Sequence, residues 1–117
     1  MLDQADMIFK GTPVASGIAR GRIKTVRGWE KDIVLDPETV LIARFPIPRI
    51  SPLLKQASAL LCAYGASDSF LAHQARVCGI PAVFNLGDSI AALPDATWVS
   101  VDGTTGVIRR DSESVAP

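Results

Sequence analysis

Apolar and polar residues alternate in the first part of the chain, which is the pattern of a half-exposed β-strand. Between residues 17 and 26, small or apolar side chains alternate with the basic residues Arg20, Arg22 and Lys24. A period of two places the basic side chains on one face of a strand, in water, and the apolar ones on the other. Gly21 lies within this run and predicts a break or bulge in the strand.

Two unbroken apolar runs follow, and they indicate strands that are covered on both faces. These runs are residues 39–43 (TVLIA) and 59–63 (ALLCA), and neither contains a charged side chain. The segment 45–51 (FPIPRIS) contains two prolines and is expected to be an ordered loop. Ser51 followed by Pro52 is typical of a helix start, which predicts a short helix through residue 56.

The second half of the chain combines turn residues with short helical and strand patterns. Small residues at 64–69 (YGASDS) predict a turn, and a helix is expected from about residue 69 to residue 78 because Gly79 ends it. Further along, the pattern predicts a strand at 81–84, a helix at 88–93, a strand at 97–101, a turn at 102–103 and a strand at 106–108. Strands that alternate with short helices place the chain in the α/β class.

The length of the chain, 117 residues, suits one domain that buries a core of its own. Both ends are polar and lack periodicity. They predict a loose N-terminus at residues 1–9 and a flexible tail at residues 109–117, which leaves a single domain at residues 10–108.

Composition and charge exclude several classes of partner. Twelve basic and twelve acidic residues cancel. Without a run of Lys and Arg, neither a nucleic acid nor an anionic membrane is an expected partner. The apolar runs are too short to span a bilayer and the first ten residues lack a signal-peptide pattern, so a cytoplasmic location is expected.

Residues that bind metals or act as nucleophiles are few. Cys62 and Cys78 are the only cysteines and both have apolar neighbours, so we expect two reduced, buried and inert thiols. His73 is the only histidine, which leaves too little material for a zinc site or a Ser-His-Asp triad. No metal is therefore expected.

The strand–loop–helix unit at residues 60–84 is the most informative stretch for chemistry. The first turn of such a helix leaves backbone N–H groups unpaired, with the positive end of the helix dipole behind them. A helix end of this kind binds phosphate in some proteins, but the same unit is also an ordinary capped turn of α/β proteins. The spacing alone leaves both interpretations open.

This unit resembles the signature of the mobile, phosphohistidine-carrying domain of phosphoenolpyruvate synthase and pyruvate phosphate dikinase. The family signature is Gly-Gly-x-x-Ser/Thr-His-x-Ala-Ile-x-Ala-Arg-x-x-Gly-Ile-Pro-Ala-Val, and residues 65–83 align with it without a gap. The matching residues are Gly65, Ser69, Ala72, Ala75, Arg76, Gly79, Ile80, Pro81, Ala82 and Val83. Shorter matches on both sides extend the resemblance to about residues 10–108.

The resemblance implies a swivelling β/β/α fold, in which a small barrel-like β sandwich carries the signature helix on one side. In complete family members this domain rotates between a nucleotide-binding domain and a phosphoenolpyruvate or pyruvate barrel, and it carries a phosphoryl group between them. This chain has no P-loop, and a barrel of that kind needs about 250 residues. The resemblance therefore implies that ATP, phosphoenolpyruvate and Mg bind only on partner domains, and that this chain binds no cofactor.

The sequence departs from the family pattern at two positions in the site. Ala66 replaces the second glycine and restricts the backbone of the loop. Phe70 occupies the position of the phosphate-accepting histidine, and a phenyl ring has no lone pair with which to accept a phosphoryl group. No catalytic residue is therefore expected there. Asp68 adds a negative charge, which also disfavours an anion.

His73 is the alternative acceptor. A gapped alignment brings it to the acceptor position but loses several matches in the loop and helix. Without the gap, His73 lies one turn after Phe70 and opposite Leu71 and Ala75, which predicts a solvent-facing side chain beside Arg76.

Phe70 itself has two interpretations. It packs on Val77 or closes the preceding loop, or it joins Leu71 in presenting an apolar contact to a partner. The polar residues of the loop are expected to cap the helix: Ser67, Asp68 and Ser69.

Three functions remain open from the sequence. The first is a degenerate, non-phosphorylatable mobile domain that acts as a docking or regulatory subunit, or is a fragment of a larger protein. Its partner is a dikinase-like nucleotide-binding or phosphoenolpyruvate-binding protein or domain. The second is a freestanding phosphoryl carrier that uses His73. The third is a swivelling small subunit of an unrelated enzyme, since a fold does not fix a function.

Overall fold

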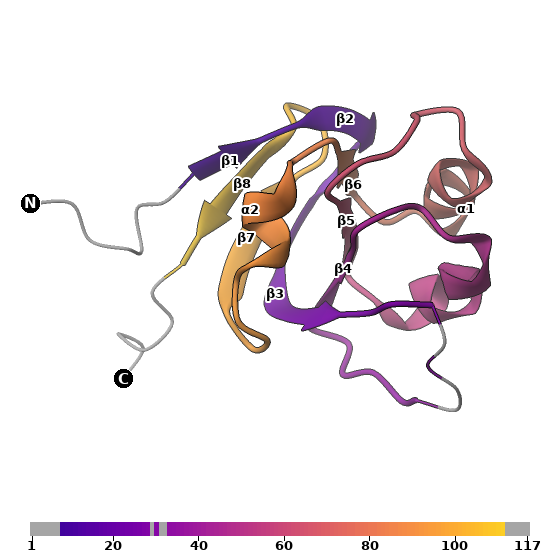
Figure 1. Ribbon diagram of the computed structural model, residues 1–117, viewed down its shortest axis with the longest axis horizontal. Helices are drawn as coiled ribbons and strands as arrows, with labels where there is room; N and C mark the ends of the chain where they lie inside the picture. The colour runs from indigo at the N-terminus through magenta and orange to yellow at the C-terminus, as the bar shows by residue number, and fades with distance from the viewer. Residues whose placement is uncertain (1–7, 29, 31–32, 112–117) are drawn as a thin grey trace, which may run out of the picture.

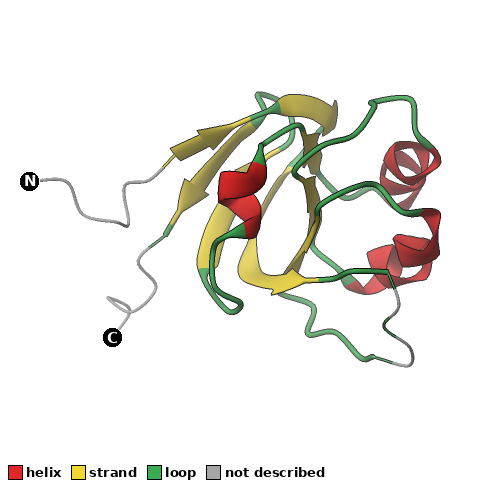
Figure 2. Cartoon of the chain, viewed as in Figure 1, coloured by secondary structure: helices red, strands yellow, loops and turns green. Residues whose placement is uncertain are grey.

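The computed structural model describes residues 8–28, 30 and 33–111. These residues form one eight-stranded sheet with two α-helices and a 3₁₀ helix (Figures 1 and 2). The elements in chain order are β1 (Ile8–Lys10), β2 (Thr12–Ala15), β3 (Ile18–Thr25), β4 (Thr39–Ala43), η2 (Pro48–Gln56), β5 (Ala59–Cys62), α1 (Phe70–Cys78), β6 (Ala82–Phe84), α2 (Asp88–Ala91), β7 (Trp98–Asp102) and β8 (Val107–Arg110). None of the helices in the described part of the chain is long and apolar enough to cross a membrane.

The sheet closes on itself through its first two strands. Its order is β1-β8-β7-β3-β4-β5-β6-β2, with β3 to β6 parallel and the outer strands antiparallel. Only Gly11 separates β1 from β2, so one segment pairs with both ends of the sheet. The Gly11 N–H donates to the carbonyl of Gly106 at 2.8 Å. A Cβ at Gly11 would lie 2.3 Å from the carbonyl oxygen of Phe84, so only glycine fits this corner. The expected barrel-like sandwich is confirmed.

The four parallel strands separate two apolar cores. In β4, Leu41 and Ala43 belong to one core, which α1 and η2 cover, and Val40 and Ile42 belong to the other. The second core lies between the parallel strands, α2 and the antiparallel strands β1, β7 and β8. Figure 1 shows α1 and η2 together on one side of the sheet and α2 apart from them. This is the layered α/β arrangement that the sequence predicted.

The expected strands at residues 39–43 and 59–63 and the half-exposed strand at residues 17–26 are confirmed as β4, β5 and β3. The expected bulge at Gly21 is wrong, because β3 pairs with β7 in unbroken register from Ile18 to Arg22. A Cβ at Gly21 would lie 2.1 Å from the carbonyl oxygen of Glu38. This glycine therefore permits the backbone of β3 to lie close to the backbone of Glu38, just before β4.

The helix expected at Ser51 begins earlier, at Pro48, and it is a 3₁₀ helix. The prolines exclude an α-helix interior but fit this tighter turn, so the loop expected at residues 45–51 is shorter than predicted.

The chain ends are more ordered than predicted where the structure describes them. Ile8 and Phe9, expected to be loose, lie in β1, and Phe9 is buried. Arg109 and Arg110, expected in the flexible tail, lie in β8. The rest of the expected loose ends, residues 1–7 and 112–117, falls outside the described residues.

Candidate functional site

The signature helix α1 begins and ends where its caps place it. Ser69 adopts an extended backbone, and its hydroxyl oxygen accepts the N–H of Ala72 at 3.3 Å. Gly79 ends the helix in the left-handed region at φ 74°, as expected. Of the three expected caps, Ser69 is confirmed, whereas Ser67 and Asp68 lie exposed in the turn before it.

One face of α1 is fully buried. Leu71, Ala72 and Ala75 have no exposed surface and pack into the core shared with η2. The expectation that Leu71 contacts a partner is therefore wrong, because its side chain is sealed inside the domain. Cys78 is half-buried rather than buried.

The other face of α1 carries the residues of interest. Phe70 is the first helical residue and is 52% exposed. His73 is also exposed, as predicted. Val77 is 65% exposed, so packing of Phe70 against Val77 does not remove either side chain from water. The phenyl ring therefore lies in solvent at the start of the helix, where the family places its acceptor.

The loop that leads into α1 is held in place by short contacts. The Gly65 N–H donates to Oδ1 of Asn85 at 3.1 Å, and the Ser69 N–H donates to the carbonyl of Ala66 at 3.1 Å. A Cβ at Gly65 would lie 2.7 Å from ring carbons of Pro46. Close packing against Pro46 therefore requires glycine at the first glycine position of the signature, Gly65. Ala66 replaces only the second glycine.

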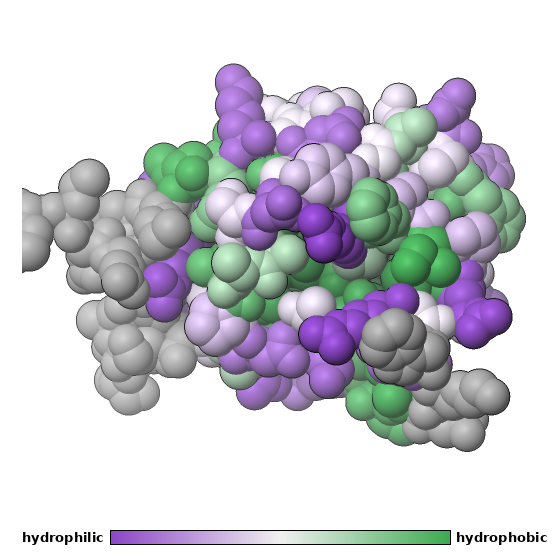
Figure 3. Space-filling view, in the orientation of Figure 1, coloured by the Kyte–Doolittle hydropathy of each residue, from purple (hydrophilic) through white to green (hydrophobic). Residues whose placement is uncertain are grey.

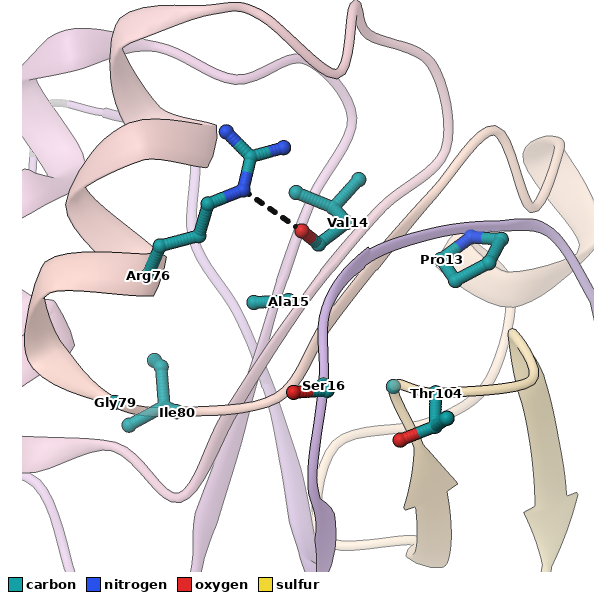
Figure 4. Close-up of a pocket in the computed structure, with 9 residues that line it drawn as sticks. Pro13, Val14, Ala15, Ser16, Arg76, Gly79, Ile80 and Thr104 are labelled. Carbon is teal, nitrogen blue, oxygen red and sulfur yellow. Dashed lines mark hydrogen bonds between the residues drawn. The ribbon is translucent and has the colours of Figure 1, made fainter.

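Arg76 is exposed, as predicted, but its guanidinium is also hydrogen-bonded to the backbone. Its Nε donates to the carbonyl of Val14 at 2.9 Å, and an Nη donates to the carbonyl of Ser67 at 2.8 Å. The guanidinium joins α1 to β2 and to the signature loop. It borders a shallow groove of about 620 Å³ between α1, the β2–β3 turn and the β7–β8 turn (Figure 4).

A second set of contacts lies at the start of the signature loop. The rings of Tyr64 and Phe45 stack with centroids 5.9 Å apart, and Nε of Arg44 lies 3.3 Å from Oδ1 of Asp88. A hydrogen bond to the Asp88 carboxylate raises the pKa of the Tyr64 hydroxyl. The apolar runs do not predict this network, because its members lie in the loop after β4, the loop after β5 and the first turn of α2.

The described residues contain no cluster of three or more His, Cys, Asp or Glu side chains that would hold a metal ion. Burial raises the pKa of the Cys62 thiol to about 12, so this sulfur is protonated and inert at neutral pH. At the start of α1, Phe70 and Asp68 are exposed, and the phenyl ring has no lone pair with which to accept a phosphoryl group.

Residues 35–106 match the family described as the mobile domain of phosphoenolpyruvate-utilising enzymes. The phosphoenolpyruvate synthase of Aeropyrum pernix is 33% identical over 90% of this chain, which covers 13% of that protein. The phosphoenolpyruvate synthase of Escherichia coli is 30% identical over 90% of the chain, and the chain covers 14% of it. The uncharacterised phosphotransferase YvkC of Bacillus subtilis is 33% identical over 89% of the chain, and the chain covers 12% of it. The chain thus spans about an eighth of the length of these relatives.

Solved structures share the fold at lower identity. Aconitase X of Thermococcus kodakaraensis in its holo-form has a TM-score of 0.66 at 20% identity, covering 89% of this chain and 98% of the solved one. The N-terminal domain of Enzyme 1 - Nitrogen has a TM-score of 0.55 at 22% identity, covering 71% of this chain and 35% of the solved one. These likenesses concern the fold alone. The family match over residues 35–106 and the relatives at 30% identity or more show that the chain belongs to the mobile-domain family of phosphoenolpyruvate-utilising enzymes.

Proposed function

We propose that this chain is a mobile domain that has lost its phosphoryl acceptor and acts as a docking or regulatory element beside a dikinase-like partner. The observation that carries the proposal is Phe70 at the first position of α1, exposed where the family has its histidine. The phosphohistidine chemistry of the family needs an imidazole nitrogen with a lone pair, neutral near physiological pH, and the phenyl ring offers none.

The retained shape supports a docking role. The buried face of α1, its serine cap and its glycine stop follow the family signature, while the acceptor position does not. A partner that recognises the surface of a mobile domain would still find this fold. The proposed partner is a nucleotide-binding or phosphoenolpyruvate-binding protein or domain, in the cytoplasm, that binds ATP, phosphoenolpyruvate and Mg itself. The chain, which covers 12–14% of the relatives named above, corresponds to one part of such larger proteins.

A phosphoryl carrier that uses His73 is the second candidate, favoured by the exposure of this single histidine on α1. Against it, the backbone N–H of His73 already donates to the carbonyl of Ser69 at 3.1 Å, inside the helix. The N–H groups that a helix leaves unpaired belong to its first turn, which precedes His73 in the chain. His73 therefore lacks the amide cradle that a phosphorylated side chain at the helix start would have.

The test is phosphoryl transfer. The chain is incubated with the Aeropyrum pernix phosphoenolpyruvate synthase and labelled substrate, and the label on the enzyme's own mobile domain serves as the positive control. We expect no acid-labile, base-stable label on this chain. Label on the wild type that disappears in His73→Ala would establish the carrier function and refute the proposal. The aconitase X likeness rests on the fold alone; a small subunit of an unrelated enzyme would instead co-purify with a large enzyme that has no ATP-binding domain.

A further inference from the structure

A pocket lies at the carboxyl ends of the parallel strands β3 and β4. It has a volume of about 350 Å³ and opens between the segments that follow these strands and α2. We call it the carboxyl-end pocket. Figure 3 views the molecule as Figure 1 does and shows hydrophobic surface between strongly hydrophilic side chains near the middle of this face.

The interior of the carboxyl-end pocket is apolar. Val26 is buried, and Phe45, Ile47 and Ala91 form the remaining apolar lining. A volume of this size accommodates a small organic molecule, and such sites combine apolar walls with a few polar groups that fix orientation. The pocket thus offers a surface for an apolar body such as a phenyl ring.

Positive charge borders the same pocket. Arg27 and Arg44 both contribute to its lining. Arg44 lies 3.3 Å from the carboxylate of Asp88, and the two side chains are 62% and 60% exposed. An ion pair this exposed contributes little to stability. A ligand carboxylate can therefore replace Asp88 beside Arg44 with little loss of free energy. The guanidinium fork matches a carboxylate in two parallel hydrogen bonds.

Hydrogen bonds and an aromatic stack support the rim on two sides. The carboxylate of Glu30 accepts the N–H groups of Arg27 at 2.8 Å and Gly28 at 2.9 Å, which fixes the turn after β3. Burial raises the pKa of the Glu30 carboxyl, but these backbone hydrogen bonds outweigh it and the pKa lies below its usual value. On the other side, the stack of Phe45 on Tyr64 orients the phenyl wall. A preformed site loses less entropy on binding.

We infer that the carboxyl-end pocket binds a small organic anion that joins an apolar, preferably aromatic, body to a carboxylate. The apolar body contacts Phe45, Ile47 and Ala91, and the carboxylate contacts Arg44 in exchange for Asp88. This inference is independent of the proposed loss of phosphoryl transfer, because none of the pocket's lining residues lies in α1 or the signature loop.

Titration of the whole chain, labelled with ¹⁵N, tests this inference by amide chemical shifts. The probes are phenylacetate, its neutral isostere phenylacetamide, and acetate, which lacks the apolar body. We expect saturable shifts with phenylacetate at the amides lining the pocket. Phenylacetamide should bind about threefold more weakly because it lacks the charge, and acetate at least about tenfold more weakly because it lacks the apolar contact.

Variants separate the pocket from general anion binding. Arg44→Gln should weaken phenylacetate binding about threefold, the effect of losing one exposed ion pair, and Ala91→Leu should weaken it by filling the pocket. Arg49→Gln, at an exposed arginine of η2 outside the pocket, is the matched control and should leave binding unchanged. The inference is overturned if phenylacetate gives no saturable shifts at the pocket, if phenylacetamide binds equally well, or if Arg44→Gln and Arg49→Gln have the same effect.

Discussion

The two faces of α1 differ in burial and in their agreement with the family signature. On the inner face, Leu71, Ala72 and Ala75 are fully buried, and the two alanines match the family signature. On the outer face, Phe70 and His73 are exposed, and both depart from the residues that the family has there. The same nine-residue helix therefore keeps the signature on its buried face and at exposed Arg76, and departs from it at Phe70 and His73.

This difference separates what the signature does for the fold from what it does for chemistry. The inner residues, the cap and the glycine stop are required by packing and backbone geometry, which apply to any chain with this fold. The acceptor histidine contributes chemistry alone. Its replacement by Phe70 costs the fold little, because an exposed first-turn position imposes no volume on its side chain.

The largest expected difference in the free energy of unfolding is between Leu71→Ala and Phe70→Ala. Leu71→Ala removes a fully buried side chain and leaves a cavity, so it should lower the free energy of unfolding by about 2–5 kcal/mol. Phe70→Ala should lower it by no more than about 0.5 kcal/mol. Urea unfolding followed by circular dichroism measures both, and equal losses would contradict the division between the two faces.

Gly65→Ala tests whether the loop keeps its first glycine for packing. The new methyl group would lie 2.7 Å from ring carbons of Pro46, so something must shift, and we expect a loss of about 1–3 kcal/mol. Gly79→Ala is the comparison, because no atom lies within 4 Å of a Cβ there and its cost comes only from the positive φ, which Gly65 shares. An unchanged unfolding midpoint for Gly65→Ala would exclude the packing explanation.

The two cysteines offer a contrast that depends on pH. The folded chain holds the proton of Cys62 more tightly than the unfolded chain, since burial raises its pKa from 9.0 to about 12. The protonated thiol therefore contributes to the free energy of unfolding, and this contribution is full below the ordinary thiol pKa. It is lost as the pH rises towards 12, by at most about 1.4 kcal/mol per pH unit. Unfolding of the wild type at alkaline pH should therefore be steeper in pH than that of Cys62→Ala.

Alkylation at neutral pH provides the companion measurement. Half-buried Cys78 should react readily, while buried Cys62 should react only as fast as the domain opens. Comparable rates for the two thiols in the native chain would show that Cys62 is not sealed beneath the signature loop.

The smallest expected effect concerns the helix cap. Ser69→Ala removes the acceptor of the Ala72 N–H and should cost about 1 kcal/mol. Ser67→Ala, two residues earlier and exposed, should stay within about 0.5 kcal/mol of the wild type. If Ser67→Ala costs more than Ser69→Ala, the cap has been assigned to the wrong residue.

The sequence predicted the parts of the fold that local patterns determine. The apolar runs located β4 and β5, and Gly79 located the end of α1, because strand burial and helix capping act over a few residues. It missed β1 and β2, which are only three and four residues long and owe their pairing to closure of the sheet around Gly11. Short strands of this kind carry no periodicity of their own.

The candidate site was predictable in position but not in its contacts. The alignment placed Phe70 and His73 on the exposed face of α1, because helical periodicity fixes which residues share a face. The bonds of Arg76 to the carbonyls of Val14 and Ser67 depend on segments brought together only in the folded chain. No sequence spacing reports such contacts.

Restoring the histidine tests the central claim most directly. Wild type, Phe70→His and His73→Ala are each incubated with the Aeropyrum pernix phosphoenolpyruvate synthase and labelled substrate, and acid-labile label on the chain is measured. The account predicts label on Phe70→His and none on the wild type, because the shape survives and only the nucleophile is missing. Label on the wild type that is lost in His73→Ala would contradict it.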